Sequence, residues 1–265
     1  TSYGNSLSLG LAYPLVRSLD ANWTAALNAV GVVTNSQTSE ITTTDKYLKS
    51  MQFALDGNSG DRSILLGQNA WFFRGVLTSG QVSDKASLPD SFQPLGAYTK
   101  LAASANAKIV LDKEKSIFSI LNVRGQAANT NLDPYEKLLV GGYSGVRAYS
   151  NETGSFNNGF IASLELRKNF YSEWGRFSPG VFVDYAYGWI NHSTYPDWQT
   201  NQGFSNPSLS NLLILSGAGI GVDWAHESGV MASLTWARRL PMSPAGTSGT
   251  GNGNSQLWFA VKYQF

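Results

Sequence analysis

Alternation of hydrophobic and polar positions is the dominant pattern of this chain, and it is clearest at the C-terminus. From Leu257 to Phe265 every second side chain is large and apolar, while the side chains between them after Trp258 are Ala, Lys and Gln. A period of two is typical of a β-strand with one apolar and one polar face. A last strand that faces lipid on one side and a polar lumen on the other is typical of a transmembrane β-barrel.

The same alternation recurs along the chain, and helical periodicity is hard to find. It predicts about eleven strands, at residues 7–13, 23–29, 47–55, 64–76, 96–110, 116–128, 159–169, 178–190, 211–225, 229–240 and 256–265. Most of them approach the roughly ten residues that a tilted strand needs to cross a bilayer.

The predicted connections alternate between short and long. The short ones lie near residues 17–21, 56–61, 111–115, 171–176 and 226–228, and the long ones near 34–45, 77–94, 129–158, 191–210 and 241–255. Tight periplasmic turns and longer extracellular loops are typical of an up-and-down membrane barrel. A soluble all-β sandwich, the alternative, has no reason to sort its loops in this way.

An odd strand count conflicts with the even number of strands in bacterial single-chain barrels. The alternation makes the first strand, near Tyr3–Pro14, run from the outside towards the periplasm, in the same direction as the last strand. Two neighbours that run in the same direction cannot close an antiparallel barrel, and an open edge in lipid leaves backbone groups unpaired. We therefore expect residues 1–265 to form a barrel domain with further strands upstream; a count that is wrong by one strand is the alternative.

Composition narrows the class of protein further. Net charge is +1, so no bulk attraction to nucleic acid is expected. Cysteine is absent, which excludes disulfides and thiolate chemistry and is compatible with folding in the periplasm. The chain starts at Thr1 without an initiator methionine or a signal peptide, so we expect a processed or truncated product.

No arrangement typical of an enzyme is visible. His192 and His226 fall in different connections, on opposite sides of the predicted membrane, so they cannot share a metal or a triad. Without cysteine, a tetrahedral zinc site is not expected either. The Gly-rich segment 246–254 has the composition of a flexible linker. We expect no catalytic residues, no metal and no cofactor.

Several short motifs follow one another along the chain. They are Leu11-Ala12-Tyr13-Pro14-Leu15, Val146-Arg147-Ala148-Tyr149 after Gly141-Gly142, Phe182-Val183-Asp184-Tyr185-Ala186, Gly217-Ala218-Gly219-Ile220-Gly221 and Trp236-Ala237-Arg238-Arg239-Leu240-Pro241. In this order they resemble the haemolysin secretion/activation family, the outer-membrane transporters of two-partner secretion. Its signatures read VRGY and F-x-D-x-G, so Ala148 and Ala186 replace family glycines.

The resemblance implies a barrel of about sixteen strands, five of them after the signature loop. The N-terminal strands, the periplasmic POTRA domains and any plug helix would then lie outside this chain. It further implies a bacterial outer-membrane location, a secreted exoprotein as cargo, and contacts with outer-membrane lipid. The barrel-assembly machinery would bind the C-terminal strand 257–265. No nucleic-acid partner is expected.

The resemblance also implies a site. In the family the signature arginine meets the aspartate of F-x-D-x-G, which carries over to Arg147 and Asp184. Alternation places Phe182 and Asp184 on the lumen face, and the guanidinium of an arginine can bind a carboxylate through two parallel hydrogen bonds. We expect Val146, Arg147, Ala148 and Tyr149 to hold an inward-folded loop, residues 129–158, against this wall. The alternative is a solvated loop arginine and an unrelated lumen acid.

Further lumen candidates have weaker signals. Glu165 and Arg167 alternate with leucines, which predicts a solvated wall of mixed charge, worth little per pair in water, or less often a substrate contact. Gly217, Gly219 and Gly221 share one face, either as a groove for the inserted loop or as a bend for barrel curvature. Tryptophans near strand ends, such as Trp258, are expected in interfacial girdles.

Three functions remain open from the sequence. The first is translocation of a partner exoprotein, gated by the VRAY loop at 146–149. The second is a passive porin or structural surface barrel, and the third is an insertase for other barrels. POTRA domains upstream of Thr1 would favour translocation, and their absence would favour a pore.

Overall fold

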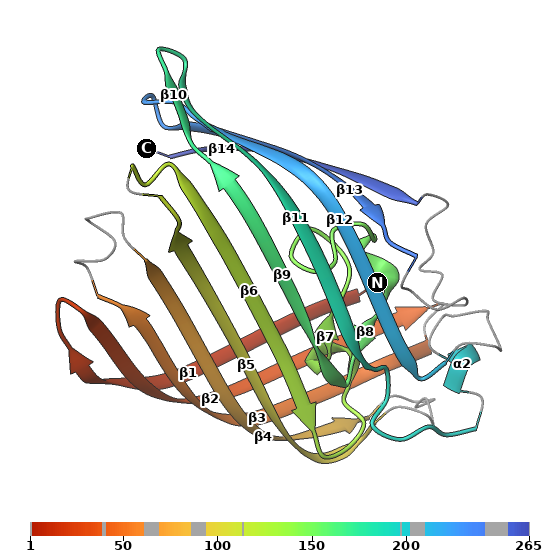
Figure 1. Ribbon diagram of the computed structural model, residues 1–265. Coiled ribbons are helices and arrows are strands. Elements are labelled where there is room, and N and C mark those ends of the chain that lie inside the picture. The colour runs from red at the N-terminus through yellow and green to blue at the C-terminus, as the bar shows by residue number, and fades with distance from the viewer. Residues whose placement is uncertain are drawn as a thin grey trace.

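One antiparallel sheet dominates the computed structural model, which describes residues 2–38, 41–60, 69–85, 94–112, 114–196, 198–201, 210–241 and 254–264 (Figure 1). Its long strands are β1 (Ser2–Arg17), β2 (Ala21–Thr38), β3 (Ile41–Ser59), β4 (Ala70–Asp84), β5 (Gly96–Val110), β6 (Ile117–Ala128), β9 (Asn158–Lys168), β11 (Gly175–Trp189), β12 (Leu212–Ala225), β13 (Val230–Arg239) and β14 (Ser255–Tyr263). The short β10 (Phe170–Ser172) pairs with the start of β11.

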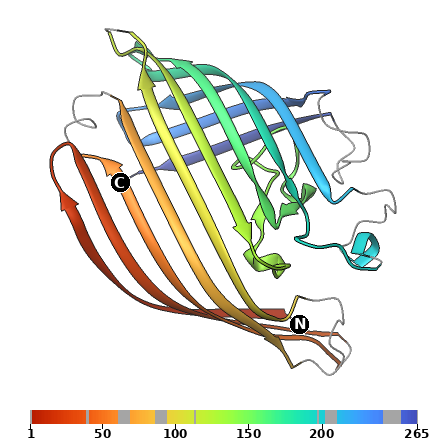
Figure 2. The same ribbon diagram turned by 60° about the horizontal axis from the view of Figure 1, so that its bottom comes forward.

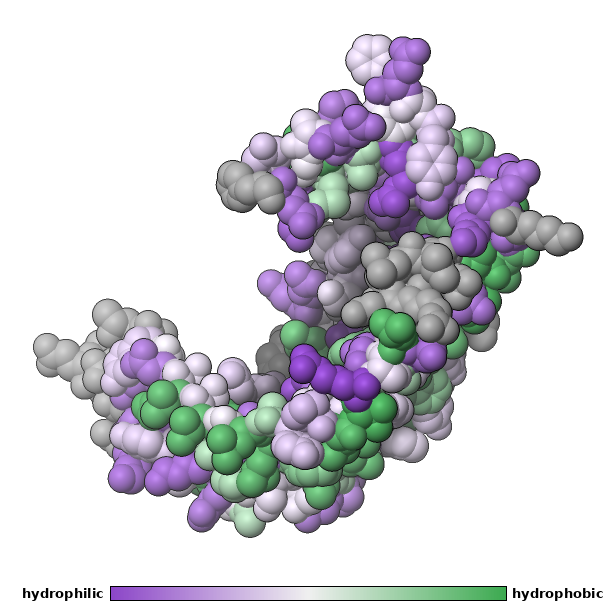
Figure 3. All heavy atoms as spheres, turned by 90° about the vertical axis from the view of Figure 1, so that its left-hand side faces the viewer, coloured by the Kyte–Doolittle hydropathy of each residue, from purple (hydrophilic) through white to green (hydrophobic). Residues whose placement is uncertain are grey.

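Each long strand pairs with the next one along the chain, so the order in the sheet follows the sequence from β1 to β14. The prediction of about eleven antiparallel strands with a barrel-like arrangement is confirmed. Within the described residues β1 and β14 form the two edges, and the sheet curves into a trough rather than a closed cylinder (Figures 2 and 3).

The outer face of the trough is apolar, as the alternation predicts. Leu11 on β1 is 81% exposed and Phe259 on β14 is 70% exposed. Many other large apolar side chains are also exposed, and Figure 3 shows hydrophobic patches along the curved lower side. A soluble protein rarely exposes apolar area on this scale. The same strands place Asp184 and Thr78, both fully buried, towards the concave side.

The predicted connections are partly wrong. Most of the long connection expected at 34–45 is strand, because β2 runs to Thr38 and β3 begins at Ile41, and residues 39–40 lie outside the described residues; likewise β4 continues to Asp84. Most of the short turn expected at 56–61 is also strand, because β3 runs to Ser59, and residues 61–68, with the start of the strand expected at 64–76, lie outside the described residues. A strand continues as long as its backbone pairs with the neighbouring strand. This pairing extends beyond the bilayer, where lipid no longer requires apolar side chains, so the apolar pattern underestimates strand length. Phe265 and residues 246–253 lie outside the described residues.

The predicted inward loop lies in the hollow of the trough (Figures 1 and 2). Between β6 and β9 it forms the 3-10 helices η1 (Pro134–Glu136) and η2 (Asn151–Thr153) and the short hairpin of β7 (Leu138–Leu139) and β8 (Ser155–Phe156). We call residues 129–158 the lumen loop and residues 140–149 its tip. The only described α-helix, α2 (Trp198–Asn201), is a single turn, so no described helix could cross a membrane.

Candidate functional site: the lumen loop and its anchor

The loop tip folds into a compact turn before it meets the wall. The backbone N–H of Val146 donates to the carbonyl of Val140 at 2.8 Å, and that of Gly142 donates to Tyr149 at 3.0 Å. Gly142 has φ of +87°, a conformation that side chains rarely adopt. A Cβ at Gly145 would lie 2.2 Å from the carbonyl oxygen of Val140. The glycines around the motif therefore allow the close turn that presents Arg147.

Arg147 binds Asp184 through three hydrogen bonds. Its Nε donates to Oδ2 at 2.9 Å, its Nη2 donates to Oδ1 at 2.7 Å, and its backbone N–H donates to Oδ2 at 2.9 Å. The Asp184 carboxylate is fully buried on β11. The two parallel side-chain bonds form the bidentate arrangement that fixes a guanidinium in orientation as well as in position.

The rest of the guanidinium is also occupied. Nη1 donates to the carboxylate of Glu165, and Nη2 donates to the hydroxyl of Ser163 at 2.8 Å, both on β9. The guanidinium carbon lies 3.4 Å from the ring centroid of Phe182, within the range of a cation–π contact. Burial lowers the pKa of Arg147, but Asp184 and Glu165 more than offset this and raise it overall. The arginine is therefore a fixed charge at the centre of the site.

Glu165 and Arg167 differ from the expected solvated wall. Both side chains are buried, and Arg167 Nε donates to Glu165 Oε2 at 2.7 Å. Arg167 also donates to the carboxylate of Asp223 and, at 3.2 Å, to the carbonyl of Ser178. The lumen loop and neighbouring strands bury Glu165 and Arg167, so the carboxylate of Glu165 links the loop arginine to a chain of charges that runs from β9 to the half-exposed Asp223 on β12.

The three glycines of β12 have different neighbours. A Cβ at Gly217 would lie 2.7 Å from Cβ of Ala148, so the loop tip approaches the wall at this position. A Cβ at Gly219 would lie 2.5 Å from the ring of Phe182, and a Cβ at Gly221 would lie 3.0 Å from the hydroxyl oxygen of Thr235. The groove interpretation therefore describes Gly217, and Gly219 makes room for the ring beneath the guanidinium.

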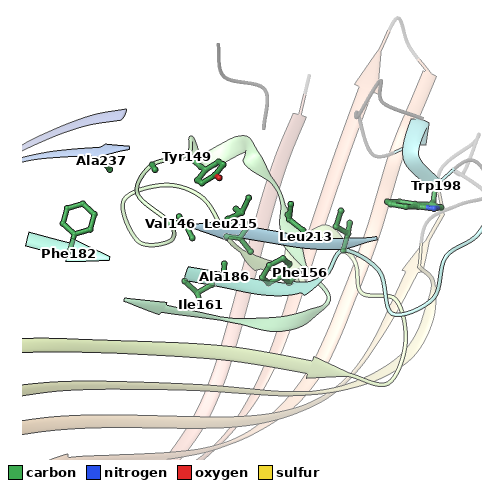
Figure 4. Packing of buried hydrophobic residues seen from close by; sticks show 13 residues of the cluster. Val146, Tyr149, Phe156, Ile161, Phe182, Ala186, Trp198, Leu213, Leu215 and Ala237 are labelled. Atoms are coloured by element: carbon green, nitrogen blue, oxygen red, sulfur yellow. The ribbon is translucent and has the colours of Figure 1, made fainter. Parts of the chain in front are cut away.

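Apolar packing supports the polar anchor. The buried cluster contains Val146, Ala148 and Tyr149 from the loop tip and Phe156 from β8. Figure 4 shows Val146, Tyr149 and Phe156 beside Leu213 and Leu215 of β12. Val146 and Ala148 have no exposed surface, and Tyr149 is 1% exposed. The motif thus places the single buried charge of Arg147 among apolar side chains that contact the wall.

Three contacts of this site were not predicted: those of Ser163, Trp258 and Arg239. Trp258 on β14 donates from Nε1 to the carbonyl of Arg147 at 2.8 Å, and its ring meets that of Tyr143 edge-on. The prediction of an interfacial girdle is therefore wrong for Trp258, although the alternation of β14 already places it on the lumen face. The Arg239 guanidinium lies 4.4 Å from the ring centroid of Tyr149, and no local pattern signals that contact.

This fold and this loop define an outer-membrane β-barrel with an inward-folded loop anchored to its wall. The family description "Haemolysin secretion/activation protein ShlB/FhaC/HecB" matches residues 4–223, most of the chain. The chain belongs to the haemolysin secretion/activation family, and its location is the outer membrane of a Gram-negative bacterium.

Individual relatives agree with this assignment. The heme/hemopexin transporter protein HuxB of Haemophilus influenzae is 22% identical over 247 residues, which are 90% of this chain and 41% of that protein. The solved structure of CdiB from Escherichia coli has a TM-score of 0.72 at 19% identity and covers 98% of this chain and 45% of its own. CdiB from Acinetobacter baumannii has a TM-score of 0.68 at 16% identity, with coverages of 98% and 42%. The chain thus spans less than half the length of these relatives.

Proposed function

We propose that the whole protein moves a partner exoprotein from the periplasm to the cell surface, and that the lumen loop gates the barrel. Membership of a secretion family supports the transport step. The observation that carries the gate is the burial of Arg147 against Asp184, Glu165 and Ser163 on two strands of the wall. Val146, Ala148 and Tyr149 would fix the tip beside it, and Phe182 would support the guanidinium from below.

The chemistry of the anchor suits a reversible closure. A buried ion pair gains attraction but loses hydration, so its net contribution is much smaller than its contacts suggest. When the tip leaves the wall, the guanidinium and both carboxylates regain water from the aqueous lumen. The closed and open arrangements can therefore differ by little free energy, while the bidentate geometry still selects one closed position.

Substitution of Arg147→Ala in the full-length protein tests the proposal. We expect the barrel to insert into the outer membrane, because the sheet does not depend on this contact, but secretion of the partner exoprotein to fall. Arg74→Ala is the matched control: it removes a guanidinium from the same inner wall, where Arg74 forms a more exposed pair with Asp56. Wild-type secretion by correctly inserted Arg147→Ala protein would contradict the gate.

Two alternative functions predict different observations. A passive porin would conduct ions in the wild-type form, and its conductance would not depend on a partner exoprotein. An insertase would alter the assembly of other outer-membrane barrels when it is deleted. We expect neither outcome, because the lumen loop fills the space beside the wall with a packed, buried cluster.

A further inference from the structure

The lumen loop has a second attachment, well separated in the fold from the Arg147 anchor. We call residues 131–137, at the start of the loop, the dock segment. Lys46 on β3 binds Asp133 at 2.7 Å, and Lys100 on β5 binds the Glu136 carboxylate and, at 2.9 Å, its backbone carbonyl. The carboxylate side chains are 8% and 7% exposed, so these pairs are shielded from water.

Apolar packing and local hydrogen bonds complete this attachment. Leu132 is 1% exposed and packs in a cluster formed by residues of four neighbouring strands, Val32, Leu48, Val82 and Tyr98. The Asp133 carboxylate caps η1 by accepting the N–H of Tyr135 at 3.0 Å. Asn157 accepts the N–H of Leu132 at 2.7 Å. The dock segment is thus a folded turn with its own core and its own ion pairs.

The two attachments contact the wall at different places. The dock segment binds β2 to β5 near the ends of these strands, and its Asn131 and Lys137 also bind Ser193 and Ile190, just beyond the end of β11. The loop tip binds β9, β11, β12 and β14. Asp184 lies five positions before Trp189, the end of β11, which places it roughly 17 Å further down that strand. The dock contacts at Ile190 and Ser193 lie beyond Trp189, so at this distance the Asp184 anchor acts independently of them to a good approximation.

Free space lies on one side of the tip. A cavity of about 400 Å³ is lined by Tyr143 and Ser144 of the tip and by Asn106 and Asn122 of β5 and β6. The opposite side of the tip is closed by Trp258 and by Gly217. A tip that releases Asp184 can therefore move towards β5 and β6, and this movement would uncover the wall formed by β11 to β14.

We propose that the dock segment stays bound when the gate opens, so that the loop pivots about β7 and β8 instead of leaving the lumen as a whole. This inference rests on the proposed gating function and specifies its mechanism. Lys46, Lys100 and Leu132 are then positioning residues that fix the pivot. The exoprotein would pass along β11 to β14, on the side that the tip vacates.

Spin-label distances in the full-length protein test the pivot. Residues 1–265 contain no cysteine, and any cysteine elsewhere in the full-length protein is replaced by serine, so that paired labels are specific. One label replaces Leu27, exposed on the outer face of β2, and the other replaces either Tyr135 in the dock segment or Ser144 in the tip. On the Arg147→Ala background we expect the Leu27–Ser144 distances to gain a second population. The Leu27–Tyr135 distances should keep their maximum and width.

A double variant, Lys46→Ala with Lys100→Ala, shows whether the Leu27–Tyr135 distance reports on the attachment of the dock segment. We expect the double variant to broaden the Leu27–Tyr135 distance distribution. An unchanged distribution would overturn the assignment of the two lysines. A Leu27–Tyr135 distribution that broadens together with Leu27–Ser144 in the Arg147→Ala protein would overturn the pivot.

The same samples separate the pivot from the gate. Normal secretion by Arg147→Ala protein whose tip alone has moved would refute the gating function and leave the pivot intact. Lost secretion with both distributions broadened would refute the pivot and leave the gating function intact.

Discussion

Asp184→Asn is the substitution that most specifically weakens the anchor. The amide has nearly the shape of the carboxylate, so the packing of β11 is retained while the negative charge is lost. One side-chain oxygen remains as an acceptor, but the second position becomes an N–H donor that faces the Nη2 of Arg147. The bidentate pair is therefore broken, and the guanidinium keeps Glu165 and Ser163 as its side-chain partners.

The magnitude follows from the burial of the pair. Removal of one partner from a buried ion pair costs about 3–5 kcal/mol, because the other charge stays buried and unpaired. Glu165 still compensates part of the charge on Arg147, so we take the lower end, about 3 kcal/mol. At 1.36 kcal/mol for each factor of ten, the ratio of docked to released loop falls roughly 100-fold.

Hydrogen exchange in the folded barrel measures this ratio. The backbone N–H of Arg147 donates to Asp184 Oδ2 across the contact between the tip and the wall. When the loop closes faster than the amide exchanges, its exchange rate is proportional to the population of released loop. We expect this exchange to accelerate roughly 100-fold in Asp184→Asn protein, with no change in the amides of the sheet.

A matched control removes a similar charge elsewhere on the same wall. Asp56→Asn disrupts the pair with Arg74, whose side chain is 46% exposed, and exposed pairs contribute at most about 1 kcal/mol. Tip exchange should be unaffected. Acceleration of less than about threefold in Asp184→Asn protein would refute the conclusion that this pair holds the loop.

Two further predictions follow from other contacts of the loop. Trp258→Phe keeps an aromatic side chain but removes the donor to the carbonyl of Arg147; at about 1 kcal/mol for a hydrogen bond, tip exchange should accelerate roughly fivefold. Unchanged tip exchange in Trp258→Phe protein would argue against the contact. Burial lowers the pKa of Lys137 to about 8 in the docked loop, whereas a lysine in water titrates near 10.4. Between these values the released loop binds more protons than the docked loop, so docking should strengthen as pH rises from 8 to about 10. Exchange in residues 131–137, corrected for the intrinsic pH dependence, measures this, and Lys137→Met should abolish the effect.

The barrel-like sheet was predictable because lipid imposes a pattern on the sequence. Each membrane-crossing strand must present apolar side chains on one face, and Leu257, Phe259 and Val261 report this directly. Beyond the bilayer the constraint disappears. Residues 34–38 and 41–45 are therefore mostly polar and resemble a loop, although their Thr-rich sequence is compatible with the strands that the ladder extends through them.

The anchor was predictable only in part. The pairing of Arg147 with Asp184 follows from two family motifs, but the burial of Glu165 depends on the loop covering β9, which the alternation of β9 does not encode. The bridge from Lys46 to Asp133 joins residues 87 positions apart and leaves no local pattern. Such contacts appear only when the loop and both walls are placed in space.

A reversible lock on the loop tip tests the central claim, that its movement gates secretion. Cβ of Ala148 lies 2.7 Å from the position that Cβ would take at Gly217, and a disulfide needs about 3.8 Å, a shift of roughly 1 Å. In full-length protein with Ala148→Cys and Gly217→Cys, we predict that secretion stops when the disulfide forms and recovers on reduction, while secretion by each single variant does not change between the two conditions. Undiminished secretion through a fully oxidised, correctly inserted barrel would contradict the account.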